Sequence, residues 1–212
     1  AYTCIMMESV SLPPTFAAGA QVFTFRNAAW HLLDVQAKYE TWAAAVGNPA
    51  LAERLFLTAL DLADAREGAL FVVPRDPAAA VGELIAPADR LDRMTGDVPA
   101  ARQEMRSLLR NRTATDLGPA LLRALATIDG ATVVDREGRL LAAGAILLHP
   151  TMPEGPVVEG ARTTAAMAAC RFGPVLKVSA DGAMTFFDTA RLRRNQRRAR
   201  IHASGGPEAR RF

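Results

Sequence analysis

Two hairpin-like stretches in the second half of the chain constrain its fold more than any other feature. In the first, the β-branched run Thr132–Asp135 and the longer apolar run Arg139–Leu148 flank Arg136-Glu137-Gly138. In the second, Val175–Ser179 and Met184–Phe187 flank an Ala-Asp-Gly turn. Short apolar runs joined by glycine-containing turns are typical of antiparallel hairpins. Gly144, inside the longer run, predicts a bulge or a close approach of two backbones.

Upstream of the hairpins, the apolar spacing is helical. Apolar residues recur at intervals of three and four over Thr24–Val46, which predicts a first helix. A second helix is expected to start at Asn48 and Pro49, as N-cap and first helical residue, and to run to about residue 66. The period changes at Gly68, and Ala69–Val73 has the composition of a short buried strand.

The middle of the chain adds further helices. Arg75–Gly96 is broken up by proline and glycine and is expected to hold a loop, a short strand and a turn. Helices are predicted over Val98–Asn111, Asp116–Thr127 and Arg162–Phe172. In the helix predicted over Asp116–Thr127, four apolar residues are expected to face the core: Leu117, Ala120, Leu121 and Leu125. Helices alternating with strands, together with two hairpins, predict an α/β domain with a mixed β-sheet flanked by helices.

Charge divides the chain into a body and a tail. Residues 191–212 hold eight arginines and one glutamate, a net charge of +7, so residues 1–190 carry −4. We therefore expect an N-terminal extension with a helix over residues 1–47, a domain over 48–190 and a basic C-terminal tail over 191–212. The tail lacks interleaved aromatic residues, so a solvated, partly helical segment is expected; contact with nucleic acid is the alternative, and it rests on charge alone.

Several classes of protein are disfavoured. No apolar run approaches the roughly 20 residues of a membrane span, and the first residues do not have the pattern of a signal peptide. Cys4 and Cys170 are too few for a disulfide framework, and His31, His149 and His202 are scattered rather than spaced as metal ligands. These features predict a cytoplasmic protein with no membrane partner.

One stretch has the features of a phosphate-binding site. Glu159–Ala166 lies at the end of a loop rich in proline and glycine and opens a predicted helix. A helix N-terminus presents unpaired backbone N–H groups and a partial positive charge. Gly160 allows close approach, Arg162 adds a planar cation, and Thr163 and Thr164 add two hydroxyl groups. An ordinary loop-to-helix junction with hydroxyl capping is the alternative interpretation of this stretch alone.

A second candidate site is the sequence Asp129-Gly130-Ala131, at the junction of a predicted helix and a strand. A carboxylate there can hold a divalent metal, and Gly130 allows a planar ligand to lie against the backbone. Asp-Gly is also a common turn, so the motif alone is weak. If the first hairpin and the loop after it bring Asp129 to face the helix start at Gly160, the two form a nucleotide site in which a metal bridges phosphate oxygens.

The order of these features resembles the diadenylate cyclase (DAC) domain of the DNA-integrity-scanning protein family. Leu57–Val73 is similar to the leading helix and first strand of that domain, and Ile128–Leu148 to the segment around its Asp-Gly-Ala motif. Gly160–Ala166 falls where the family has Gly-Thr-Arg-His-Arg-Ala-Ala, and Val175–Phe187 resembles its closing hairpin. The resemblance covers about residues 50–188.

The resemblance implies an activity and roles for residues. Enzymes of the family join two ATP molecules into cyclic di-AMP, release pyrophosphate, use Mg²⁺ or Mn²⁺, and act as a dimer in which each protomer supplies one ATP. It implies that Asp129 holds the metal and assists the attacking hydroxyl, and that Arg162 contacts the phosphates. The implied nucleotide-binding residues are Gly130, Ala131, Gly160, Arg162, Thr163, Thr164 and Ser179. It also implies a homodimer or higher oligomer as the assembly.

The chain departs from the family pattern at the phosphate end. Ala161-Arg162-Thr163-Thr164 stands where the family has Thr-Arg-His-Arg, so the imidazole and the second guanidinium are missing. Phosphoryl transfer depends on positive charge placed at the phosphates, and losing such groups costs a few kcal/mol, or several powers of ten in rate. We therefore expect a domain that binds ATP or cyclic di-AMP with weak or absent catalysis. The alternatives are an active diadenylate cyclase and a scaffold with a vestigial site.

Overall fold

The structure, a computed structural model, describes residues 15–18, 21–26, 29–32, 35–92, 100–148 and 160–189. The chain divides into two compact units, Ala1–Thr41 and Trp42–Phe212, and each is described by itself. The predicted loop at 149–159 and the basic tail at 191–212 lie outside the described residues. The domain boundaries proposed from the sequence, at residues 47 and 190, stay predictions.

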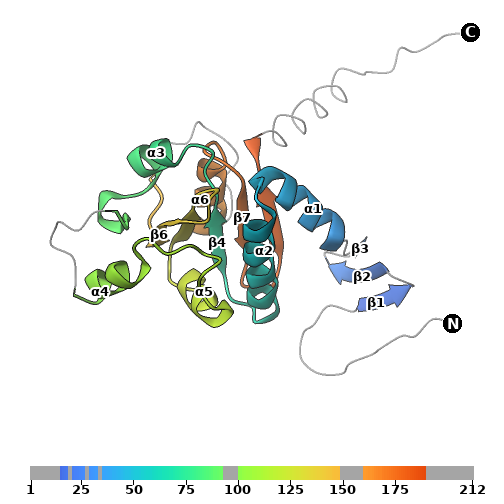
Figure 1. Cartoon of the computed structure of the whole chain (residues 1–212). Coiled ribbons are helices and arrows are strands. Elements are labelled where there is room, and N and C mark those ends of the chain that lie inside the picture. The colour runs from blue at the N-terminus through green and yellow to red at the C-terminus, as the bar shows by residue number, and fades with distance from the viewer. Residues whose placement is uncertain are drawn as a thin grey trace, which may run out of the picture. The chain divides into compact units, whose positions relative to one another are not determined.

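The larger unit contains a five-stranded mixed sheet with the order β6-β5-β4-β7-β8 (Figure 1). Strands β4 and β5 are parallel, and the other neighbouring pairs are antiparallel. This confirms the predicted α/β class, the mixed sheet and both hairpins. The strands are β4 (Ala69–Val72), β5 (Ala131–Val134), β6 (Leu140–Ala145), β7 (Val175–Val178) and β8 (Met184–Phe187).

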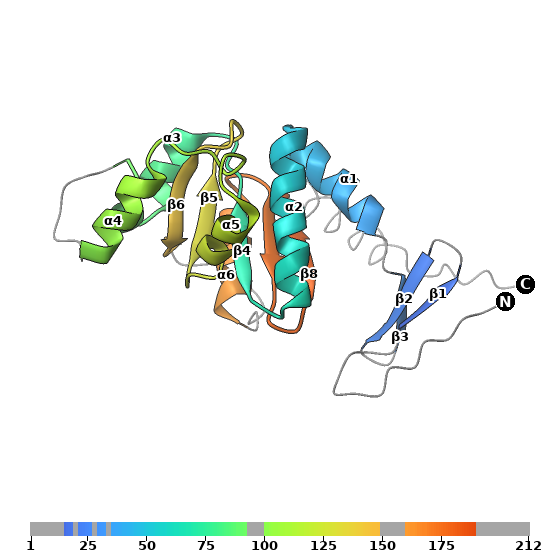
Figure 2. The same ribbon diagram turned by 60° about the horizontal axis from the view of Figure 1, so that its bottom comes forward.

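Helices cover both faces of this sheet (Figure 2). The alternation of side chains in β4 explains how one strand serves both layers. Leu70 and Val72 belong to a buried cluster with Ala166 and Ala169, two residues of the helix that covers one face, so Phe71 points to the other face. The three strand residues, Leu70, Phe71 and Val72, are each 2% exposed or less. The covering helices are α6 (Ala161–Ala169) on the first face and α2 (Pro49–Asp64) and α5 (Pro119–Ala126) on the second.

Helix α2 begins where the sequence predicts. The Asn48 side chain accepts a hydrogen bond from the Leu51 N–H at 3.2 Å, and Pro49 occupies the first turn, where its missing N–H costs nothing. The Asn48 amide also donates to the Arg136 carbonyl at 2.8 Å, which ties the helix start to the β5–β6 turn. The preceding helix is α1 (Val35–Val46). Near its C-terminal end, the Trp42 indole donates a hydrogen bond to the Ala52 carbonyl at 3.0 Å.

The prediction of a helix over Thr24–Val46 is wrong at its N-terminal end. The smaller unit holds a three-stranded antiparallel sheet, and the helix begins only at Val35. Valine, phenylalanine and tryptophan between residues 22 and 30 favour strands, and short apolar runs fit a period of two as well as one of 3.6. The strands are β1 (Thr15–Ala18), β2 (Gln21–Arg26) and β3 (Ala29–Leu32).

The segment after β4 is more helical than the sequence predicts. Asp76 accepts hydrogen bonds from the Ala78 and Ala79 N–H groups and starts a helix at Pro77. The expected short strand is reduced to two isolated bridges, Ile85 with Leu147 and Arg90 with Ala142. The short helices here are α3 (Pro77–Ala79), the π-helix η1 (Ala80–Leu84) and the 3-10 helix η2 (Pro87–Asp89).

The next two helices are present, and one has a different buried face. Helix α4 (Ala100–Leu109) lies within the predicted range. Helix α5 starts at Pro119 rather than at residue 116, so Leu117 precedes the helix and does not set its period. Leu122 and Leu125 therefore turn inward, whereas Ala120 and Leu121, predicted to be buried, are exposed. Among the described helices, none is long and apolar enough to cross a bilayer.

Candidate functional site

The two candidate motifs meet at one edge of the five-stranded sheet. Because β4 and β5 are parallel, their first residues lie at the same edge, and these strands follow Gly68 and Gly130. Strand β7 is antiparallel to β4, and the pairing of Ala69 with Val178 brings Ser179, just after β7, to this edge as well. The sheet topology thus gathers the Asp-Gly-Ala motif and the end of β7 at the edge where α6 begins.

An ion pair joins the two motifs. The Arg162 Nη2 atom lies 3.7 Å from Asp129 Oδ1, with the carboxylate side chain fully exposed and the guanidinium side chain 43% exposed. This distance is too long for a hydrogen bond, and an exposed pair of this kind contributes little to stability. A phosphate or a metal ion can therefore replace the contact at small cost.

Gly68 positions the Arg162 side chain. A Cβ atom on Gly68 would lie 2.6 Å from Arg162 Nη1 and 3.0 Å from its Cζ, so the guanidinium rests on the glycine backbone just before β4. The sequence pattern marks Gly68 only as the point where the period changes. A glycine between a predicted helix and a buried strand was the only sequence feature that pointed to Gly68, and it did not indicate that an arginine side chain lies on it.

Gly130 and Gly144 hold Asp129 in place by close backbone packing. Gly130 has φ +116°, and a Cβ on it would lie 2.5 Å from the Gly144 carbonyl carbon and 2.7 Å from the Ala145 nitrogen. Gly144 has φ +60°, and a Cβ there would collide with Ile128. The pairing of β5 with β6 shifts register around this point, which agrees with the predicted bulge or close approach at Gly144.

This packing bears on the predicted ligand contacts. The space that a side chain at residue 130 would occupy is filled by β6, so Gly130 faces protein there rather than an open surface. Ala131 is 1% exposed and belongs to the buried core cluster under the site. Asp129, by contrast, presents its whole carboxylate to solvent.

The start of α6 has an incompletely capped first turn. Gly160 has φ +93°, and its carbonyl accepts the Thr163 and Thr164 N–H groups at 3.0 and 3.2 Å and the Thr164 hydroxyl at 3.4 Å. No side chain caps the helix at Gly160. The N–H groups of Ala161 and Arg162 precede the helical hydrogen-bond pattern and point out of the helix start, as an anion-binding turn requires.

A lysine that the sequence pattern does not single out also reaches this turn. The Lys177 ammonium, from the middle of β7, donates a hydrogen bond to the Thr163 hydroxyl at 2.8 Å. The only available sequence signal was a charged residue inside the otherwise apolar strand Val175–Val178. Ser179, the predicted phosphate contact two residues on, is half-buried, and its N–H bonds the Ala183 carbonyl within the β7–β8 turn.

The donor set suits a metal held jointly with a ligand. Within the described residues, no group of three His, Cys, Asp or Glu side chains could hold an ion. Mg²⁺ is commonly bound by one or two carboxylates together with substrate phosphates and water. A lone exposed carboxylate such as Asp129 fits that pattern and does not fit a structural site enclosed by protein ligands.

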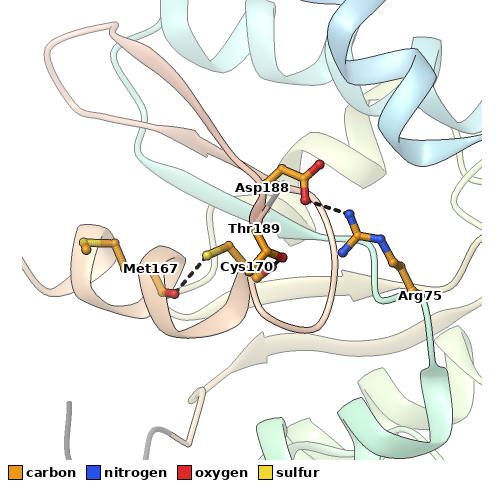
Figure 3. A network of polar contacts seen from close by, with 5 residues as sticks. All are labelled: Arg75, Met167, Cys170, Asp188 and Thr189. Atoms are coloured by element: carbon orange, nitrogen blue, oxygen red, sulfur yellow. Dashed lines mark hydrogen bonds and ion pairs between the residues drawn. The ribbon is translucent and has the colours of Figure 1, made fainter. Parts of the chain in front are cut away.

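A second polar network lies at the opposite edge of the sheet (Figure 3). Arg75 donates to Asp188 at 2.6 Å, and the Thr189 hydroxyl donates to the Cys170 carbonyl at 2.8 Å. The Cys170 thiol donates to the Met167 carbonyl. Burial, with a smaller contribution from Asp188, raises the pKa of the Cys170 thiol. A thiol that resists ionisation is a poor nucleophile, so this network closes the ends of β4, β8 and α6 rather than forming a reactive site.

Comparisons with known proteins give distant likenesses only. No family model matches the chain, and no curated protein matches it. Among solved structures, it is similar to a hypothetical membrane spanning protein from Bacillus cereus, with 22% identity and a TM-score of 0.44, over 65% of this chain and 59% of that one. It is also similar to a double mutant of DacA from Staphylococcus aureus, with 18% identity and a TM-score of 0.38, over 65% of this chain and 81% of that one. Both TM-scores lie below 0.5.

Proposed function

We propose that the unit Trp42–Phe212 binds an adenine nucleotide, ATP or cyclic di-AMP, with the phosphates at the first turn of α6. The observation that carries this proposal is the exposed ion pair between Asp129 and Arg162 at the start of that helix. A phosphate group offers Arg162 a charge-assisted, bidentate partner that is stronger than a carboxylate at 3.7 Å. The sequence resemblance to the diadenylate cyclase domain supplies the nucleotide class.

A divalent metal, Mg²⁺ or Mn²⁺, is part of the proposal. Asp129 would hold it, because its carboxylate is fully exposed and released from Arg162 once the guanidinium turns to phosphate. The metal would neutralise charge on the phosphates to which it is bound. Arg162, Thr163, Thr164 and the Gly160 turn would orient the phosphate oxygens through hydrogen bonds, and Ser179 would contact them from the end of β7.

We propose binding with weak or absent catalysis, rather than efficient cyclisation. Thr163 and Thr164 are neutral, and a hydroxyl can bind a phosphate oxygen but cannot neutralise its charge. Cyclisation also needs a second ATP on a partner protomer, so it would require a homodimer or higher oligomer that presents two of these sites to each other. An active diadenylate cyclase is the second candidate, favoured by the position of Asp129 opposite Arg162.

The test is to incubate the full chain with ATP and Mn²⁺ and to chromatograph the mixture for cyclic di-AMP. Nucleotide affinity is measured in parallel by calorimetry, with and without EDTA. We expect ATP or cyclic di-AMP to bind in a metal-dependent manner, with little or no product. Asp129→Asn should weaken the metal-dependent binding, whereas Asp61→Asn, at an exposed carboxylate on α2, should leave it unchanged.

Two results would overturn parts of this proposal. Product that forms in the wild type and disappears in Asp129→Asn would establish the cyclase and remove the binding-only function. The absence of calorimetric heat and of any thermal shift with ATP and with cyclic di-AMP would remove both candidates and leave a scaffold.

A further inference from the structure

Lys177 has an environment that its position in a strand does not explain. On its two sides, Lys177 pairs with Leu70 of β4 and with Thr185 of β8. Its side chain therefore lies on the same face of the sheet as that of Leu70, which is the face that α6 covers. The residue is half-buried there, between Leu176 and Val178 in sequence. A charged group in such a place needs hydrogen-bond partners or an opposite charge to offset its loss of hydration.

Within the residues that the structure describes, this ammonium has one neutral hydrogen-bond partner. It donates to the Thr163 hydroxyl at 2.8 Å, and in the described part of the chain no ion pair joins it to a carboxylate. A lysine ammonium has three donors, so this bond leaves two for another acceptor. Because the Thr163 oxygen accepts from Lys177, its own hydrogen remains for donation outward.

We propose that Lys177 is the second phosphate-binding cation of the site. It would act with Arg162 and the first turn of α6, where Thr163 and Thr164 supply no charge. This inference rests on the proposed function. The Arg162 side chain extends from the first turn of α6 over Gly68 toward Asp129, and Lys177 reaches the same turn from β7 through Thr163. Two cations of different origin would thus flank the phosphates, one as a planar fork and the other as a flexible point charge.

The competing explanation is that Lys177 only anchors α6 to β7. An anchoring bond would affect the folded state as a whole, so its loss would weaken every ligand of the site by a similar factor. A phosphate contact would affect ligands in proportion to their phosphate charge. Comparison of ATP with adenosine therefore separates the two explanations.

The first experiment measures ATP and adenosine binding to the full chain by calorimetry. In Lys177→Met, which keeps the length of the side chain and removes the charge, we expect ATP to bind about tenfold more weakly and adenosine to bind as in the wild type. Lys177→Arg should restore most of the ATP affinity. Lys38→Met, at the other lysine of the chain and exposed on α1, should change neither. Unchanged ATP affinity in Lys177→Met, or an equal loss for ATP and adenosine, would overturn the inference.

The second experiment needs no variant. The chain has only two lysines, so an amine-acylating reagent followed by mass spectrometry reports on each of them. Saturating ATP should protect Lys177 and leave Lys38 as reactive as before. ATP that binds by calorimetry without protecting Lys177 would overturn this inference alone, whereas a wild-type chain that binds neither ATP nor cyclic di-AMP would overturn the proposed function with it.

Discussion

At the scale of single residues, the candidate site depends on positions where a side chain is absent. Gly68 leaves room for the Arg162 guanidinium, and Gly130 and Gly144 let β5 and β6 approach closely beneath Asp129. The three glycines differ in what a Cβ would meet. At Gly68 it would meet the end of a flexible side chain, and at Gly130 it would meet backbone. Substitutions at the two positions should therefore have separable effects on binding and on stability.

Gly68→Ala should weaken ATP binding without unfolding the protein. The new Cβ would lie 2.6 Å from Arg162 Nη1, and the guanidinium can swing away at little cost. We expect the loss of one charge-assisted contact to lower ATP affinity by about tenfold, measured by calorimetry, with a nearly unchanged melting temperature. The matched control is Gly82→Ala, where a Cβ would meet nothing within 4 Å. Equal ATP affinity in wild type and Gly68→Ala would argue against Arg162 as a phosphate ligand.

Gly130→Ala should instead destabilise the fold. Its φ of +116° is strained for any residue with a side chain, and the Cβ would press on the Gly144 and Ala145 backbone. Strain and overpacking together should lower the free energy of unfolding by about 2–4 kcal/mol, as measured by urea denaturation. Gly118→Ala, at a negative φ with open space around it, should cost about 1 kcal/mol or less. A Gly130→Ala protein as stable as the wild type would contradict the close packing of β5 on β6.

The Cys170 thiol should make stability fall at alkaline pH. Burial raises its pKa above the ordinary value of 9.0, so above that pH the unfolded chain loses this proton while the folded chain keeps it. The unfolded state then binds fewer protons, and the free energy of unfolding decreases as pH rises. Urea midpoints measured from pH 8 upward should decline less in Cys170→Ala than in the wild type. Identical declines would show that the thiol ionises equally in both states.

At the scale of helices and strands, the sequence predicts the ends of an element reliably where a capping residue or a turn residue within a few positions defines them. Asn48 caps α2 as the sequence predicts, and the glycine-containing turns produce the two hairpins. Apolar spacing without an end signal is less reliable. Residues 24–26 and 29–32 fit a helical period and nevertheless belong to β2 and β3, because aromatic and β-branched residues also satisfy an alternating pattern that pairs with a neighbouring strand.

Asn48→Ala should destabilise the larger unit through two lost hydrogen bonds. The side chain caps the Leu51 N–H and donates to the Arg136 carbonyl, so its removal affects both the start of α2 and its link to the β5–β6 turn. We expect a loss of about 1–2 kcal/mol in thermal or urea unfolding. Asn48→Asp keeps the capping oxygen and lacks the amide donor, and should lie between alanine and wild type. Alanine and aspartate variants of equal stability would show that the cap contributes nothing.

At the scale of the whole molecule, charge is unevenly divided along the chain. Residues 191–212 carry +7 and the rest carries −4, so any long-range attraction for polyanions should come from the tail. The candidate site, as we propose it, would instead use two cations at short range, Arg162 and Lys177. Polyanion binding and nucleotide binding should therefore be independent of each other.

Removal of residues 191–212 should abolish weak, salt-sensitive binding to nucleic acid and leave ATP affinity unchanged. Each arginine that contacts a phosphate releases condensed counterions, so binding by the full chain should weaken steeply as salt rises. The measurement is fluorescence anisotropy with a labelled oligonucleotide over a salt series, with ATP calorimetry on both proteins. Equal oligonucleotide binding by the shortened protein would exclude the tail as the contact.

The sequence by itself determined the elements with local causes: the capped start of α2, the buried strand β4, the two hairpins and the first turn of α6. It also singled out Asp129 and Arg162 as members of one site, and the structure places them 3.7 Å apart. These features follow from turn chemistry, capping and short-range periodicity, which act over a few residues.

Only the tertiary structure decided which strand neighbours which, and therefore what surrounds the site. The parallel pairing of β4 with β5 brings Gly68 beside Asp129, and the packing of α6 on β7 brings Lys177 to Thr163. Gly68 and Asp129 are far apart along the chain, and no local pattern around either residue indicates that the other lies beside it. Long-range strand order results from the burial of both sheet faces at once, a property of the whole core that no short window of sequence contains.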